Sequence, residues 1–112
     1  MRVTATPIAN ARQRPRFLNE LCRRLVAAGA QRIYLFGSYA RGEADEDSDV
    51  DLVVLKQTAL PFLDRLREAA ACLDPDWPVD VLVYTPAEWE QMQEHGNAFA
   101  ELVSEEGIVL HG

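Results

Sequence analysis

The sequence predicts an α/β (α+β) fold with a small mixed β-sheet flanked by helices. Its 112 residues are 48% hydrophobic, which suffices for one core but not for two. Short apolar runs of strand length alternate with amphipathic segments of helical period, in the order helix, strand, turn, strand, helix, strand, helix. No apolar run approaches the roughly 20 residues needed to cross a bilayer, so no membrane association is expected.

The first half of the chain supplies a helix and then a strand. A helix is expected from Phe17, because Leu21 and Leu25 follow it at four-residue steps. Gly29 stands where a C-cap glycine belongs. Residues 33–36 form a continuous apolar run, typical of a strand buried on both faces.

A turn and a second strand come next. Residues 38–41 are expected to form one helical turn, and 43–48 an acidic loop. A strand is expected over 50–55, interrupted only by Asp51. The next amphipathic helix is expected from about Pro61 to Leu73, with proline at its first position.

The last third of the chain adds two strands and two helices. A strand is expected over 79–84, and 85–88 form a capping box that begins a helix ending near Gly96. A final helix over about 98–105 and a short strand over 108–110 complete the prediction.

Charge is unevenly distributed along the chain, whose net charge is −7. Residues 1–42 hold eight arginines and one acid, whereas 43–112 hold three basic and seventeen acidic residues. Free nucleic acid is therefore not expected to bind the acidic part. The basic residues 1–42 are compatible with contact to a triphosphate, an acidic protein surface, RNA or solvent alone. Residues 1–15 are expected to form a flexible basic arm.

The N-terminal sequence and the cysteines indicate the cellular location and the state of the thiols. The N-terminal residues contain no apolar stretch of signal-peptide type, so a cytoplasmic location is expected. Cys22 and Cys72 lie in apolar-periodic segments, which favours buried free thiols over a disulfide. No CxxC motif or Cys/His cluster is present, so a zinc site is not expected.

Three aspartates are the candidate catalytic and metal-binding residues. Asp49 and Asp51 are two residues apart, so on a strand their carboxylates share a face. Asp51 lies in an apolar strand, where an unpaired charge is costly and a cation would compensate it. If the strand that contains Asp80 lies alongside, three carboxylates converge. Oxygen ligands of this kind suit Mg²⁺ and a two-metal site for nucleotide transfer.

Gly37, Ser38 and Arg41 are the candidate residues for binding the nucleotide. A glycine after a strand lets backbone N–H groups approach a phosphate, and the Ser38 hydroxyl can donate to a phosphate oxygen. Arg41, one turn further on, would contact the triphosphate. Each feature alone is weak: a Gly-Ser pair is usually only a turn, and a DxD usually two solvated acids. Their combination at this spacing favours a nucleotide site.

The stretch GSYARGEADEDSDVDLVV resembles the signature of the DNA polymerase β-type nucleotidyltransferase superfamily. More narrowly, it resembles minimal nucleotidyltransferases (MNT), the antitoxins of HEPN/MNT toxin–antitoxin pairs. Gly37, Ser38, Asp49 and Asp51 match the family's GS-x10-DxD, and Asp80 matches its third metal-binding carboxylate. The resemblance covers roughly residues 17–110 and implies a polymerase β-like nucleotidyltransferase domain over 16–112.

The resemblance also implies an activity and a partner. The expected cofactors are Mg²⁺ and ATP, with transfer of AMP to a hydroxyl. In the toxin–antitoxin branch this hydroxyl belongs to a tyrosine of a HEPN ribonuclease, whose activity is thereby blocked. Two alternatives stay open: a catalytically silent antitoxin that acts by binding, and a transferase for small molecules such as aminoglycosides. A homo- or hetero-oligomer is compatible with each.

Overall fold

The structure of the protein is a computed structural model that describes residues 14–112. The flexible arm predicted over residues 1–15 therefore lies outside the described residues, apart from Arg14 and Pro15. Within the described range, no helix is both long enough and apolar enough to cross a membrane.

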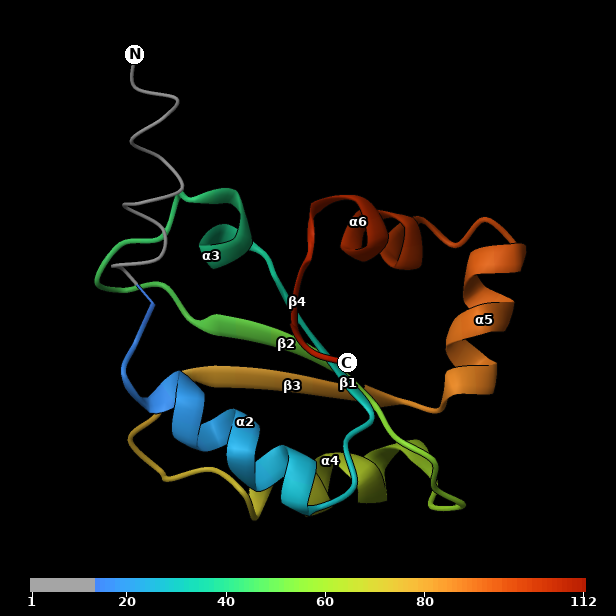
Figure 1. Ribbon diagram of the computed structural model, residues 1–112, viewed down its shortest axis with the longest axis horizontal. Coiled ribbons are helices and arrows are strands. Elements are labelled where there is room, and N and C mark those ends of the chain that lie inside the picture. The colour runs from blue at the N-terminus through green and yellow to red at the C-terminus, as the bar shows by residue number, and fades with distance from the viewer. Residues whose placement is uncertain (1–13) are drawn as a thin grey trace.

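Four strands form one mixed sheet, in the order β3-β2-β1-β4 (Figure 1). Strand β1 (Arg32–Phe36) pairs antiparallel with β2 (Val50–Leu55) and with β4 (Ile108–His111). On the other side, β2 pairs in parallel with β3 (Val79–Tyr84). The predicted mixed sheet is confirmed, with β3 and β4 as its two edge strands.

Helices cover both faces of this sheet (Figure 1). Helices α2 (Phe17–Ala27) and α4 (Phe62–Ala70) contribute to the hydrophobic cluster on one face. Helices α5 (Pro86–Glu94) and α6 (Ala98–Glu106) contribute to the cluster on the other. The short helix α3 (Ser38–Arg41) joins β1 to the acidic loop before β2. The predicted flanking by helices is thus confirmed.

The two central strands are buried on both faces, which explains their continuous apolar sequence. In β1, Ile33 and Leu35 face the α2/α4 cluster, whereas Tyr34 faces the α5/α6 cluster. In β2, every residue is buried except Asp51, which is partly exposed. Cys22 and Cys72 pack against the α2/α4 cluster as free thiols, as predicted, although both are partly rather than fully buried.

The second predicted helix is shorter than expected at both ends. Helix α4 begins at Phe62 rather than Pro61, whose extended ψ of 156° makes it the N-cap. The helix ends at Ala70 rather than Leu73. The chain there tightens into shorter turns, as in the 3.1 Å hydrogen bond from the Leu73 N–H to the Ala70 carbonyl. The other predicted boundaries agree to within a residue or two.

The two tryptophans lie on opposite faces of the sheet. Trp77 packs against the α2/α4 cluster, stacked on Phe17 at 5.0 Å between ring centroids, with the Arg24 guanidinium 4.7 Å from its ring. Trp89 is 3% exposed at the centre of the α5/α6 cluster, with the Tyr84 ring 5.5 Å away. Both rings are packing residues of the sheet's two apolar layers.

An ion pair joins α4 to the start of α5. The buried Arg65 guanidinium donates to both carboxylate oxygens of Glu88, at 2.6 and 3.0 Å. The same carboxylate accepts the Thr85 N–H at 2.8 Å, which completes the predicted capping box. The Arg65 hydrogen bonds are the main reason that the pKa of Glu88 lies below its ordinary value.

Glu88→Gln is expected to lower the free energy of unfolding at neutral pH by about 1–2 kcal/mol, since Arg65 loses its counter-charge but Glu88 is partly solvated. Because folding lowers the Glu88 pKa, its stabilisation is present above the ordinary value of 4.5 and is lost as pH falls through the folded pKa. Urea unfolding of the wild-type protein and of the variant at several pH values measures the difference between their free energies of unfolding, which should disappear in acid. Glu90→Gln, an exposed change on the same helix, is the control and should show no such difference.

Candidate active site

The turn after β1 depends on a glycine. Gly37 has φ 75° and ψ −152°, a conformation that other residues rarely adopt, and it is the N-cap of α3. Its carbonyl accepts the N–H groups of Ala40 and Arg41, each at 3.1 Å. The chain thereby passes from the end of β1 to the start of α3 through a single residue, Gly37.

Asp51 lies directly beside this turn. In the antiparallel register, Asp51 of β2 pairs with Phe36, the last residue of β1. A Cβ atom added to Gly37 would lie 2.4 Å from the Asp51 Oδ2 atom, closer than any real contact. The glycine therefore brings the main chain of the turn against the carboxylate, with no room for a side chain between them.

Asp80 is the strand neighbour of Asp51. The parallel register pairs these two residues across β2 and β3, so their side chains leave the sheet on the same face. Along β2 the Asp51 side chain points to the opposite face from that of Leu52 and to the same face as that of Val53. Because Val53 belongs to the α5/α6 cluster, Asp51 and Asp80 lie on the α5/α6 face. Asp80 is exposed, whereas Asp51 is partly buried. The structure thus brings together two of the three predicted carboxylates as direct neighbours.

Asp49 precedes β2 and is exposed. Its charge acts on Asp51, whose pKa is raised chiefly by burial, then by the charges of Asp80 and Asp49. Arg41 opposes this shift and lowers the pKa of Asp51. The ionised Asp51 carboxylate is therefore disfavoured here, and a cation placed near it would relieve that cost.

The three aspartates do not form a ready-made cage. Over residues 14–112, no group of three or more His, Cys, Asp or Glu side chains is arranged to hold a metal ion. The donor chemistry of adjacent carboxylates still fits a hard divalent cation. The role of Asp49, Asp51 and Asp80 as metal ligands remains a prediction.

The two other predicted nucleotide-binding residues lie on α3. Ser38 is its first residue, and the Ser38 carbonyl accepts the Glu43 N–H at 2.9 Å. The exposed Arg41 donates from Nε to the Glu43 carboxylate at 2.8 Å, the main cause of its raised pKa. Arg41 is thus held by an acidic group near the aspartates.

One further charge near Arg41 has no signal in the sequence. Glu106, at the end of α6, also raises the pKa of Arg41, as does Asp51. No local pattern links Glu106 to Arg41, because the sheet brings them together from distant parts of the chain. Acidic residues from three parts of the fold therefore act on Arg41: Glu43 of the loop after α3, Asp51 of β2 and Glu106 of α6.

Comparison with known proteins identifies the family. The family model described as "Nucleotidyltransferase domain" matches residues 14–99. The "Probable protein adenylyltransferase MntA" of Haemophilus influenzae is 34% identical over 80 residues, which are 70% of this chain and 63% of that protein. A "Putative protein adenylyltransferase" of Methanocaldococcus jannaschii is 36% identical over 74 residues, 60% of this chain and 77% of that protein. This chain thus spans less than two thirds of the Haemophilus relative.

Two solved structures share the fold. A putative nucleotidyltransferase from Sulfolobus solfataricus superposes with a TM-score of 0.64 at 18% identity, covering 93% of this chain and 84% of its own. A crystal structure of a toxin–antitoxin with AMP-PNP superposes at 0.56 with 28% identity, covering 84% and 72%. The predicted nucleotidyltransferase fold is confirmed by the first of these. From its sheet, its glycine turn and the family match over most of its length, this chain belongs to the nucleotidyltransferase domain family.

Proposed function

We propose that this chain is a Mg²⁺-dependent protein adenylyltransferase that transfers AMP from ATP to a hydroxyl of a partner toxin and thereby acts as its antitoxin. The acceptor in this proposal is a tyrosine of a HEPN ribonuclease. The observation that carries the proposal is the juxtaposition of Gly37, Asp51 and Asp80. Support also comes from relatives named protein adenylyltransferases and from the toxin–antitoxin that was solved with AMP-PNP.

The chemistry required is simple in outline. The acceptor oxygen bonds to the α-phosphorus of ATP, the bond from that phosphorus to the bridging oxygen breaks, pyrophosphate leaves and the hydroxyl proton passes to solvent. Mg²⁺ bound by Asp49, Asp51 and Asp80 would neutralise the charge that develops on the phosphates. The donor set fits this ion because Asp51 is partly buried beside a second carboxylate.

The protein's own groups then position the triphosphate. Gly37 has no side chain to keep a phosphate away from the turn, and the Ser38 hydroxyl can donate to a phosphate oxygen. Arg41 must exchange the Glu43 carboxylate for the triphosphate, which offers a larger charge to the same guanidinium. The glycine turn and the side chains of Ser38 and Arg41 thus orient the donor before the acceptor arrives.

Asp49→Ala combined with Asp51→Ala is expected to lower label transfer from ATP, labelled at its α-phosphate, to the partner protein by at least about 100-fold. The variant should stay folded, because removing the disfavoured Asp51 charge costs no stability. Gel autoradiography measures the transfer, and circular dichroism checks the fold.

Glu46→Ala combined with Asp47→Ala removes two exposed acids of the loop that precedes Asp49 and serves as the matched control. It should transfer label at the wild-type rate. Transfer that survives in the double aspartate variant would defeat the enzymatic proposal. Wild-type protein that neutralises the toxin without any label transfer would favour the binding antitoxin instead.

Gly37→Ala is expected to impair both the fold of the turn and the reaction. The added methyl group collides with the Asp51 carboxylate, and φ of 75° is strained for alanine, so the free energy of unfolding should fall by about 1–3 kcal/mol. Displacement of the carboxylate should lower transfer by more than about tenfold even where the protein is fully folded. Gly96→Ala, at another positive φ but with only a 3.4 Å contact, should cost stability alone. Equal transfer by both variants would contradict this account.

A further inference from the structure

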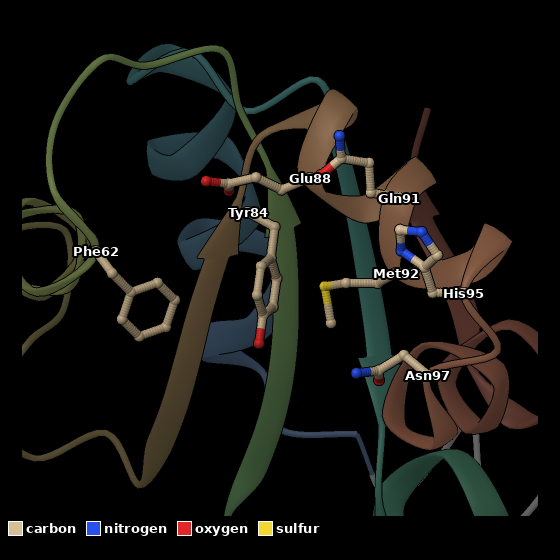
Figure 2. Close-up of a pocket in the computed structure, with 7 residues that line it drawn as sticks. All are labelled: Phe62, Tyr84, Glu88, Gln91, Met92, His95 and Asn97. Atoms are coloured by element: carbon tan, nitrogen blue, oxygen red, sulfur yellow. The ribbon is translucent and has the colours of Figure 1, made fainter.

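Two pockets in the described part of the chain differ in whether their charged side chains are already paired. One, of about 390 Å³ at the end of β3, has aromatic walls that include Phe62 and Tyr84 (Figure 2). The carboxylate of Glu88, which also lines it, is paired with Arg65. The other, of about 490 Å³, lies between the start of α2 and β4 and is lined by arginines that have no such partner.

This second pocket, the α2/β4 pocket, is positively charged. Arg14 and Arg16 precede α2 directly, and Asn19 of its first turn adds a side-chain amide. No acidic side chain of residues 14–112 lines the pocket. The rest of its described lining is mostly apolar: Pro15, Leu18, Cys22, Val109 and Leu110.

The chain itself does not neutralise these two arginines. Within residues 14–112, every other arginine and the lysine are in an ion pair except Arg32, which donates to the Tyr34 hydroxyl. Residues 1–13 contain no aspartate or glutamate that could pair with Arg14 or Arg16. The Arg14 Nε atom is also buried and has no acceptor among the described residues. A buried donor of this kind is costly, and a ligand that accepts its hydrogen bond would remove the cost.

The donors of the pocket match a phosphate group. A guanidinium presents planar pairs of N–H groups to phosphate oxygens, and two guanidiniums balance the charge of a phosphate dianion. No side chain caps α2, so the start of this 11-residue helix adds partial positive charge. The volume leaves room beside the phosphate for the rest of a small molecule. A long polyanion would extend onto the acidic half of the chain, 43–112, and be repelled there.

The α2/β4 pocket is separate from the candidate active site. Leu18, Cys22 and Leu110 of its wall belong to or pack against the α2/α4 cluster. Asp51 and Asp80 instead lie on the α5/α6 face of the sheet. A ligand in the pocket would therefore leave the aspartates and the glycine turn free.

We propose that the α2/β4 pocket binds the phosphate group of a small molecule through Arg14, Arg16 and the Asn19 amide. Both guanidiniums donate to the phosphate oxygens, and the Arg14 Nε–H gains the acceptor that it lacks. The apolar part of the lining contacts the remainder of the ligand. This site does not depend on the adenylyltransferase proposal.

Titration calorimetry with inorganic pyrophosphate, in the absence of Mg²⁺, tests the proposal. Wild-type protein is expected to bind one pyrophosphate with a Kd of about 1 mM or lower, and Arg14→Gln to raise Kd at least about tenfold. Arg67→Gln is the matched control, since it removes the same charge from an exposed position on α4 and should change Kd less than about twofold. No binding by wild type, or an equal loss in both variants, would overturn the site.

Ser38→Ala separates this pocket from the turn proposed for the triphosphate. It should bind pyrophosphate as wild type does, and a loss of binding here but not in Arg14→Gln would refute the α2/β4 site. Label transfer by Arg14→Gln should equal that of wild type, because the aspartates are untouched. If no protein transfers label but Arg14→Gln still loses pyrophosphate, the phosphate site stands and the adenylyltransferase proposal fails.

Nuclear magnetic resonance of the arginine Nε–H groups gives a readout in wild-type protein, whatever the fold of the variants. The resonance assigned to Arg14 should shift on addition of pyrophosphate, and that of Arg67 should not. An Arg14 resonance that stays in place would contradict the site. In a parallel titration, a 5′-phosphorylated oligoribonucleotide that acts at lower concentration than pyrophosphate would overturn the assignment to a small molecule in favour of RNA.

Discussion

The carboxylate of Asp51, set in an apolar strand against the main chain of Gly37, is the constraint on which this structure depends. Such a charge is costly, and the raised pKa of Asp51 expresses that cost. It is kept in place by strand register, because a slip by one residue would turn every side chain of β2 to the other face. Since β2 is buried on both sides between β1 and β3, register is firmly specified, and the glycine turn and Asp80 are fixed to Asp51 together.

The two faces of the sheet carry different tasks. The α2/α4 face holds the larger buried cluster, which includes Leu21, Ile33 and Leu52. The α5/α6 face holds a smaller cluster around Trp89, and Asp51 and Asp80 lie on this face. The larger buried core thus lies on one side of the sheet, and the aspartates that we propose as the active site lie on the other.

Much of the fold follows from local sequence. Apolar runs of strand length predict the limits of all four strands closely. The Thr85 capping box predicts the start of α5, because its hydrogen bonds join residues only three apart in the sequence. The sequence predicts the pairing of Asp51 with Asp80 only if β2 and β3 are neighbours. Local sequence does not show that they are, because helix α4 separates the two strands along the chain. The charge of Glu106 near Arg41 and the Arg65–Glu88 ion pair had no sequence signal, because tertiary packing creates both. The ends of α4 differ from the prediction for a local reason, because helix propensity shows neither that Pro61 is extended nor where the last turn tightens.

The placement of the two indoles gives the protein two separate optical reporters. Trp77, stacked beneath the Arg24 guanidinium, senses the helical layer on its own side, while the deeply enclosed Trp89 senses the opposite layer. A single-tryptophan variant of either kind would thus emit from one layer only. Loosening of the α5/α6 layer during turnover would then appear in the fluorescence of one ring while that of the other stayed constant.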